Sequence, residues 1–144
     1  MWCKIKKVVT LSLFFIVVII GILYISNKAT YTSLKKEVMD EISLTNLVKV
    51  SFRRYSDDKG TIIKDERRIE QMLAELSDIE LKKVRNISAD REYEVRIYLK
   101  DKNLGFEVTE DLNYMVIFKE SGHQLYKVLD GKNHLKMIEA LDYR

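Results

Sequence analysis

Residues 8–25 form an uninterrupted apolar stretch, VVTLSLFFIVVIIGILYI, that contains no charged residue. A helix rises about 1.5 Å per residue, so this stretch spans about 27 Å, close to the hydrocarbon thickness of about 30 Å in a bilayer. Its polar side chains, Thr10 and Ser12, carry hydroxyls that can bond to carbonyls of the same helix. The stretch therefore predicts a transmembrane helix through which residues 8–25 engage the membrane.

The charges before this stretch predict its orientation. Lys4, Lys6 and Lys7 precede it, and positively charged flanks stay on the cytoplasmic side. We expect a single-pass cell-membrane protein with a cytoplasmic N-terminus and its C-terminal domain outside the cell membrane. A cleaved secretory signal is the alternative, but the apolar run is long for a signal and Asn27-Lys28-Ala29 matches a cleavage site poorly.

The net charge of +3 resides at the N-terminus and does not indicate a nucleic-acid partner. Three of the 25 Lys and Arg residues precede the apolar stretch, and the remaining 22 are matched by 22 Asp and Glu. A nucleic-acid interface needs basic residues clustered on one element, and here they alternate with acids. Cys3 is the only cysteine and also precedes the stretch, so we expect the domain that follows to be held by its core without disulfides.

The spacing of apolar residues divides the chain into three parts. Residues 1–26 are expected to be the cytoplasmic tip and membrane anchor, 27–45 an amphipathic stalk helix, and 46–144 an extracytoplasmic α+β domain. Leu34, Val38 and Ile42 recur every four residues in the stalk segment, as on one face of a helix. Such a helix can lie on a surface or bind a partner, but packing against the following domain is the favoured interpretation.

The third part alternates between strand and helix patterns. Strands are predicted at 47–55, 61–63, 79–83, 92–100, 106–110, 114–119 and 124–129. Asp65 is expected to cap a helix with an inward stripe of Ile69, Met72, Leu73 and Leu76, and Asn133 to cap a last helix over 133–142. The clearest strand alternates apolar Tyr93, Val95, Ile97 and Leu99 with polar neighbours, which is typical of antiparallel sheets. We predict an α+β fold in which an antiparallel sheet meander carries helices on one face.

The block from Asp57 to Val84 combines a turn, Gly60, a short apolar arm, Asp65 and the spacing I-x-x-M-L-x-x-L-x-x-I-x-L-x-x-V. With the N-terminal anchor and the following meander, this layout resembles the small membrane-anchored or lipoprotein domains of unknown function found in Gram-positive bacteria. The resemblance covers about residues 45–144 and implies an extracytoplasmic bacterial protein. It implies no catalytic or binding residues.

No pattern in the chain predicts a metal, a cofactor or catalysis. His123 and His134 have no H-x-x-x-H or H-E-x-x-H spacing and no cysteine near them. Asp101, Asn103 and Gly105 match a hairpin turn better than a calcium loop, because no acid occupies the last ligand position. Phosphate-binding glycine loops and the G-x-S-x-G motif are missing from the sequence.

The remaining candidate is the outward face of the clearest strand and its neighbour, where tyrosine and arginine, residues that interfaces favour, occur together. The possible interaction face consists of Arg53, Arg54, Glu94, Arg96, Tyr98 and Lys100. An ordinary solvated face with cross-strand ion pairs has the same composition. We expect a non-enzymatic binding, sensing or interaction module. A surface-anchored hydrolase with an unrecognised site and an accessory subunit of a membrane complex are the alternatives.

Overall fold

The structure is a computed structural model that describes residues 1–144. The chain forms two compact units, residues 1–31 and residues 32–144. The first unit is dominated by α1 (Trp2–Lys28), whose apolar side chains are all exposed. The Thr10 hydroxyl donates to the Lys6 carbonyl oxygen at 2.8 Å, as expected for a hydroxyl within an apolar helix.

α1 is the single helix in the chain that is long and apolar enough to cross a membrane. This property is compatible with single-pass anchoring. A signal sequence near an N-terminus can have the same length and composition.

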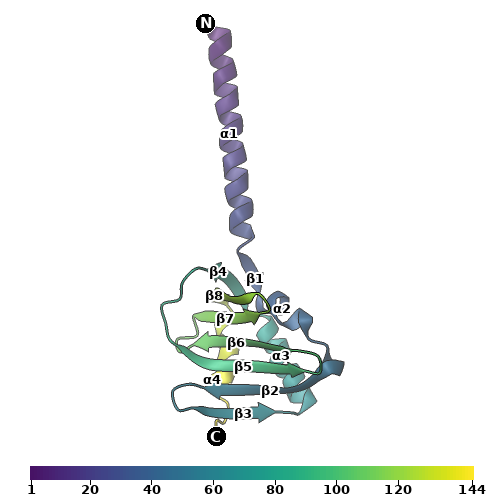
Figure 1. Cartoon of the computed structure of the whole chain (residues 1–144). Helices are drawn as coiled ribbons and strands as arrows, with labels where there is room; N and C mark the ends of the chain where they lie inside the picture. Colours follow the sequence, from purple (N-terminus) through teal and green to yellow (C-terminus); the bar gives the residue numbers. More distant parts are fainter. The chain divides into compact units, whose positions relative to one another are not determined.

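The second unit is an α+β domain, which confirms the predicted fold class. Its strands are β1 (Tyr31–Ser33), β2 (Leu47–Arg54), β3 (Lys59–Ile63), β4 (Glu80–Val84), β5 (Arg91–Leu99), β6 (Asn103–Thr109), β7 (Tyr114–Lys119) and β8 (Gly122–Asp130). They form one sheet in the order β1-β4-β8-β7-β6-β5-β2-β3 (Figure 1). Strands β5 to β8 form a consecutive antiparallel meander, β2 and β3 form a hairpin beside β5, and β4 pairs antiparallel with β8.

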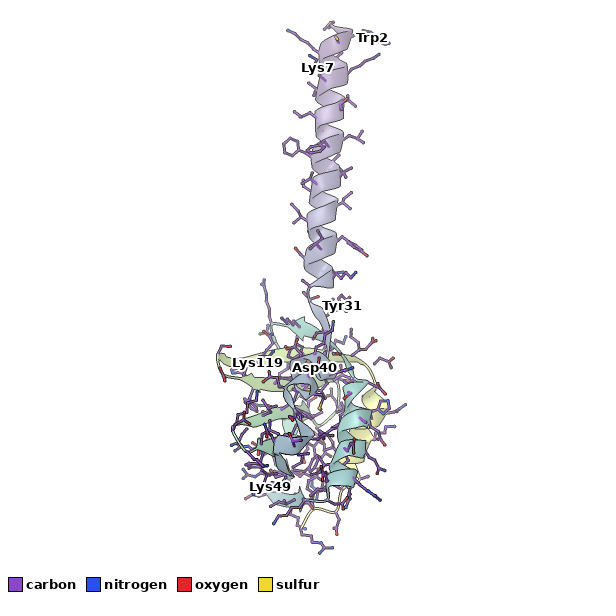
Figure 2. All side chains as sticks on the ribbon, turned by 90° about the vertical axis from the view of Figure 1, so that its right-hand side faces the viewer. Trp2, Lys7, Tyr31, Asp40, Lys49 and Lys119 are labelled. Atoms are coloured by element: carbon purple, nitrogen blue, oxygen red, sulfur yellow. The ribbon has the colours of Figure 1, made fainter.

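Helices α3 (Glu66–Ser77) and α4 (Lys132–Glu139) lie on one face of this sheet, and no helix covers the other (Figure 2). Asp65 caps α3, because its carboxylate accepts from the Arg68 amide at 2.8 Å, as predicted. The predicted stripe of α3 faces Val50, Phe52 and Val95 of the sheet. The core therefore sits between the helices and one sheet face.

The predicted stalk helix over 27–45 is wrong. That segment contains the end of α1, then β1, the short helix α2 (Leu34–Glu37), and two 3-10 turns at Met39–Glu41 and Leu44–Asn46. The four-residue spacing nevertheless identified buried residues, because Leu34 and Val38 are both in the core. Local periodicity over so few turns is weak, and strand pairing and packing determine the backbone instead.

The last helix begins one residue earlier than predicted and has a different cap. Gly131, in a left-handed conformation with φ of 82°, precedes α4, and no side chain caps the helix. A Cβ at Gly131 would lie 3.0 Å from Cα of Ile79, so close packing as well as φ requires glycine there. Asn133 lies inside the first turn and is exposed.

Candidate functional site on the open sheet face

The face of the sheet opposite α3 and α4, called the open face below, changes from apolar to charged across the strands. The strand register places five of its side chains in one row, from β8 to β2. That row reads Leu125, Val116, Glu107, Glu94 and Arg53. The charged side chains therefore gather on β6, β5 and β2.

A second row of the open face carries Ser51, Arg96, Gly105 and Phe118. Gly105 leaves room between its two neighbours, because a Cβ there would lie 3.7 Å from both Arg96 Cγ and Phe118 Cδ2 and 3.1 Å from the Val95 carbonyl oxygen. The space between Arg96 and the exposed Phe118 is therefore free of an intervening side chain.

Two glutamates of this face are buried although no helix covers them. Glu94 and Glu107 are cross-strand neighbours that are 8% and 6% exposed. Glu107 accepts from the Tyr55 hydroxyl at 2.6 Å and from Arg91 at 2.7 Å, one bond to each carboxylate oxygen. Glu94 accepts from Arg96 Nε at 2.7 Å. Long neighbouring side chains thus shield both carboxylates and pair with them, as buried charges require.

The pairing shifts the pKa values of the residues that bind these glutamates. Burial, and then the hydrogen bond to Glu107, raise the pKa of the Tyr55 hydroxyl, so it remains a donor at physiological pH. The hydrogen bond and the charge of Glu94 raise the pKa of Arg96. Each oxygen of Glu107 accepts one of these hydrogen bonds, so the carboxylate is held in place by Tyr55 and Arg91.

Beside this pair, the open face is hollowed between β2, β3 and β5, with a cavity volume of about 680 Å³. Six charged side chains line this hollow: the cations Lys49, Arg53, Arg96 and Arg144, and the acids Asp58 and Glu94. Arg53 donates through Nε at 2.8 Å and a terminal nitrogen at 2.5 Å to one oxygen of Asp58. The Lys49 ammonium lies over the Tyr98 ring, 4.7 Å from its centroid. Figure 2 shows Lys49 on the side of the sheet away from the helices.

Four of the six residues predicted to form an interaction face line this hollow: Arg53, Glu94, Arg96 and Tyr98. Arg54 does not, because successive strand residues point to opposite faces. Its guanidinium pairs with Asp57 and lies 4.7 Å from the centroid of the Tyr143 ring. Lys100 follows the end of β5 and is exposed outside the hollow.

The sequence interpretation missed Tyr55, Arg91, Glu107 and Lys49. Glu107 had a local signal, since it stands between the inward residues Phe106 and Val108. Tyr55 had none, because it is 52 positions from Glu107 in sequence and meets it only through the sheet.

A second carboxylate cluster lies near the turns that follow β5 and β7. Glu37 of α2 accepts from Lys119, from the Tyr126 hydroxyl at 2.8 Å and from the Thr32 hydroxyl at 2.9 Å. Partial burial acts to raise the pKa of Glu37, but the three hydrogen bonds outweigh it, and the pKa is lowered. Lys102 pairs with Glu41 at 2.7 Å. These ion pairs attach residues 34–41 to the sheet.

No group of three or more His, Cys, Asp or Glu that could hold a metal ion occurs in residues 1–144. His123 is exposed at the β7–β8 turn, and His134 is half-buried in the first turn of α4.

Comparison of the chain with models of protein families, with curated proteins and with solved structures finds no match.

Proposed function

We propose that this protein is a single-pass membrane protein whose α+β domain lies outside the cell membrane and binds a protein or cell-envelope partner. The observation that carries this proposal is the open face, where a sheet without helical cover presents a charged hollow. Arginine and tyrosine at its rim, Arg53, Arg96 and Tyr98, are residues enriched at protein interfaces.

The membrane part of the proposal is supported by α1 and the lysines before its apolar stretch. A long apolar helix with exposed side chains gains free energy by entering a bilayer. Lys4, Lys6 and Lys7 favour retention of the N-terminus in the cytoplasm. Anchoring raises the local concentration of the binding face near other surface proteins.

Cysteine labelling tests the orientation, because Cys3 is the only native thiol. A Cys3→Ser, Glu75→Cys variant moves the thiol to an exposed position of α3 that lies outside the hollow. In intact cells, a membrane-impermeant maleimide should label the variant, while native Cys3 should react only after permeabilisation. The reverse pattern would place the domain in the cytoplasm, and loss of residue 3 from the mature protein would show cleavage.

Site-specific photocrosslinking tests the binding face. Benzoylphenylalanine in place of Tyr98 should give an adduct in living cells, because this position lines the hollow. The same residue in place of exposed Gln71 on α3 is the matched control and should give none. Adducts from position 71 alone, or from neither position, would contradict binding through the open face.

A further inference from the structure

The hollow of the open face carries more positive than negative side chains. Its two acids are already engaged, Asp58 by Arg53 and Glu94 by Arg96. None of the salt bridges includes Lys49, and its ammonium lies over the electron-rich face of Tyr98. Arg144 at the rim pairs with Asp142, and both side chains are largely exposed, so solvent screens that pair. The hollow is therefore able to accept additional negative charge.

The arginines of the hollow also keep unused donors. A guanidinium has five N–H groups in a fixed fork. Arg53 directs two of its nitrogens to a single oxygen of Asp58, and Arg96 directs Nε to Glu94 and also interacts with Tyr98. Their side chains are 52% and 57% exposed. The remaining N–H groups can therefore bind an oxyanion that approaches from solvent.

The mixture of charges selects among anionic ligands. Glu94 and Asp58 line the same hollow, and although each is paired with an arginine, a dense polyanion such as a polyphosphate chain would bring closely spaced charges against them. Separate carboxylates along a peptide can meet the cations individually and avoid the two acids. The hollow also presents Tyr98 and the 55% exposed side chain of Ile62, which suit the apolar parts of a polypeptide.

We propose that the hollow between β2, β3 and β5 binds an acidic segment of a partner protein, with partner carboxylates held by Lys49, Arg53 and Arg96. This inference rests on the proposed function and identifies the chemistry of the partner. Arginine forks bind planar carboxylates through paired hydrogen bonds, so the contact is directional as well as electrostatic.

Binding to defined probes tests the inference. The full chain is placed in nanodiscs of zwitterionic phosphatidylcholine, which add no net lipid charge. A fluorescein-labelled peptide of alternating glutamate and serine is titrated, and its fluorescence anisotropy is measured at low and at moderate salt. A peptide with glutamine in place of glutamate and an inorganic polyphosphate are the comparison probes. We expect binding of the glutamate peptide, weaker at the higher salt concentration, and little binding of the others.

Two variants locate the site. Lys49→Gln should weaken binding of the glutamate peptide by about fivefold, whereas Lys127→Gln, the same change on the open face outside the hollow, should leave it unchanged. Arg96→Lys keeps the charge and should still weaken binding, because the fork is lost. Thermal unfolding of each variant shows that the fold is retained.

Equal binding of the glutamate and glutamine peptides, tighter binding of polyphosphate, or equal losses from Lys49→Gln and Lys127→Gln would each overturn the acidic-segment inference. A crosslinked partner at position 98 together with no binding of the glutamate peptide would leave the proposed function intact and remove this inference alone. Absence of both the crosslink at position 98 and binding of the glutamate peptide would overturn the proposed function and the acidic-segment inference together.

Discussion

At the scale of single residues, the stability of the open face depends on Glu94 and Glu107. Each carboxylate is buried by side chains that also neutralise it. Removing a partner leaves a buried carboxylate with one hydrogen bond fewer, which costs more than the hydrogen bond itself contributes. Substitutions at the partners should therefore be more harmful than their own exposure suggests.

Tyr55→Phe tests this dependence. The variant removes the 2.6 Å hydrogen bond to Glu107 and leaves Arg91 as the remaining partner. We expect a loss of about 1 kcal/mol in the free energy of unfolding, measured by urea denaturation. Tyr114→Phe is the matched control, because its hydroxyl makes only a 3.4 Å contact with Ser88. Equal losses for both variants would show that the buried glutamate is not the cause.

The hydrogen bonds of Glu37 predict a dependence of stability on pH. Its pKa in the folded protein lies below the ordinary value of 4.5, so the unfolded chain takes up the proton first as pH falls. The stabilisation is present in full above pH 4.5 and is lost as pH falls through the folded pKa. Glu37→Gln should therefore unfold with a flatter dependence on pH below 4.5 in urea denaturation.

A residual slope in that variant is expected from Asp111. Burial acts to raise the pKa of Asp111, but hydrogen bonds from Thr109 and Asn113 outweigh it and lower the pKa. An unchanged slope in Glu37→Gln would contradict the contribution of Glu37.

At the scale of elements, the two long helices of the domain begin in different ways. Asp65 caps α3 with its side chain, whereas α4 starts from Gly131 without a side-chain cap. Asp65→Ala should lower the free energy of unfolding by about 1 kcal/mol. Asn133→Ala should leave it unchanged or raise it slightly, because alanine favours the helix interior. Urea denaturation of both variants measures the difference, and a large loss in Asn133→Ala would contradict it.

Elements with a long, regular pattern were predictable from sequence, and elements determined by distant contacts were not. The stripe from Ile69 to Leu76 and the alternation from Tyr93 to Leu99 match α3 and β5 within about one residue. The helix prediction for residues 27–45 was wrong because β1 and α2 are too short to have a conformational preference of their own. Their conformation comes from the sheet and the core, which local sequence does not contain.

The candidate site was predictable to the same extent. Alternation alone places Glu94, Arg96 and Tyr98 on one face, and the register of β2 brings Arg53 beside them. Alternation also excludes Arg54 from the face of Arg53, which the prediction overlooked. The pairing of Glu94 with Glu107, and the contact of Tyr55 with Glu107, depend on strand order and had no local signal.

At the scale of the whole molecule, the core of the domain is made entirely from residues 34–143. No residue of α1 is buried. A fragment of residues 31–144, which keeps the whole of β1, should therefore keep its fold in the absence of α1 and remain soluble without detergent. We expect a single cooperative urea transition with the same midpoint by circular dichroism and by tyrosine fluorescence. Tyrosine emission can be followed directly, because Trp2, the only tryptophan, lies outside the fragment.

The full chain in detergent is the control for the fragment, and its domain should unfold at the same urea concentration. A fragment that binds hydrophobic dyes and unfolds without cooperativity would contradict the independence of the domain. In membranes, the full chain should resist extraction by alkaline carbonate, as expected for a spanning helix.

The position of β4 in the sheet has a consequence for synthesis. β4 lies between β1 and β8, although β5, β6 and β7 separate it from β8 along the chain. A chain made from its N-terminus therefore presents β4 when its only available partner is the three-residue β1. The hairpins from β5 to β8 need only short loops to close, whereas β4 must wait for β8 to emerge. The backbone edge of β4 that pairs with β8 therefore has no native partner until the last strand has been made.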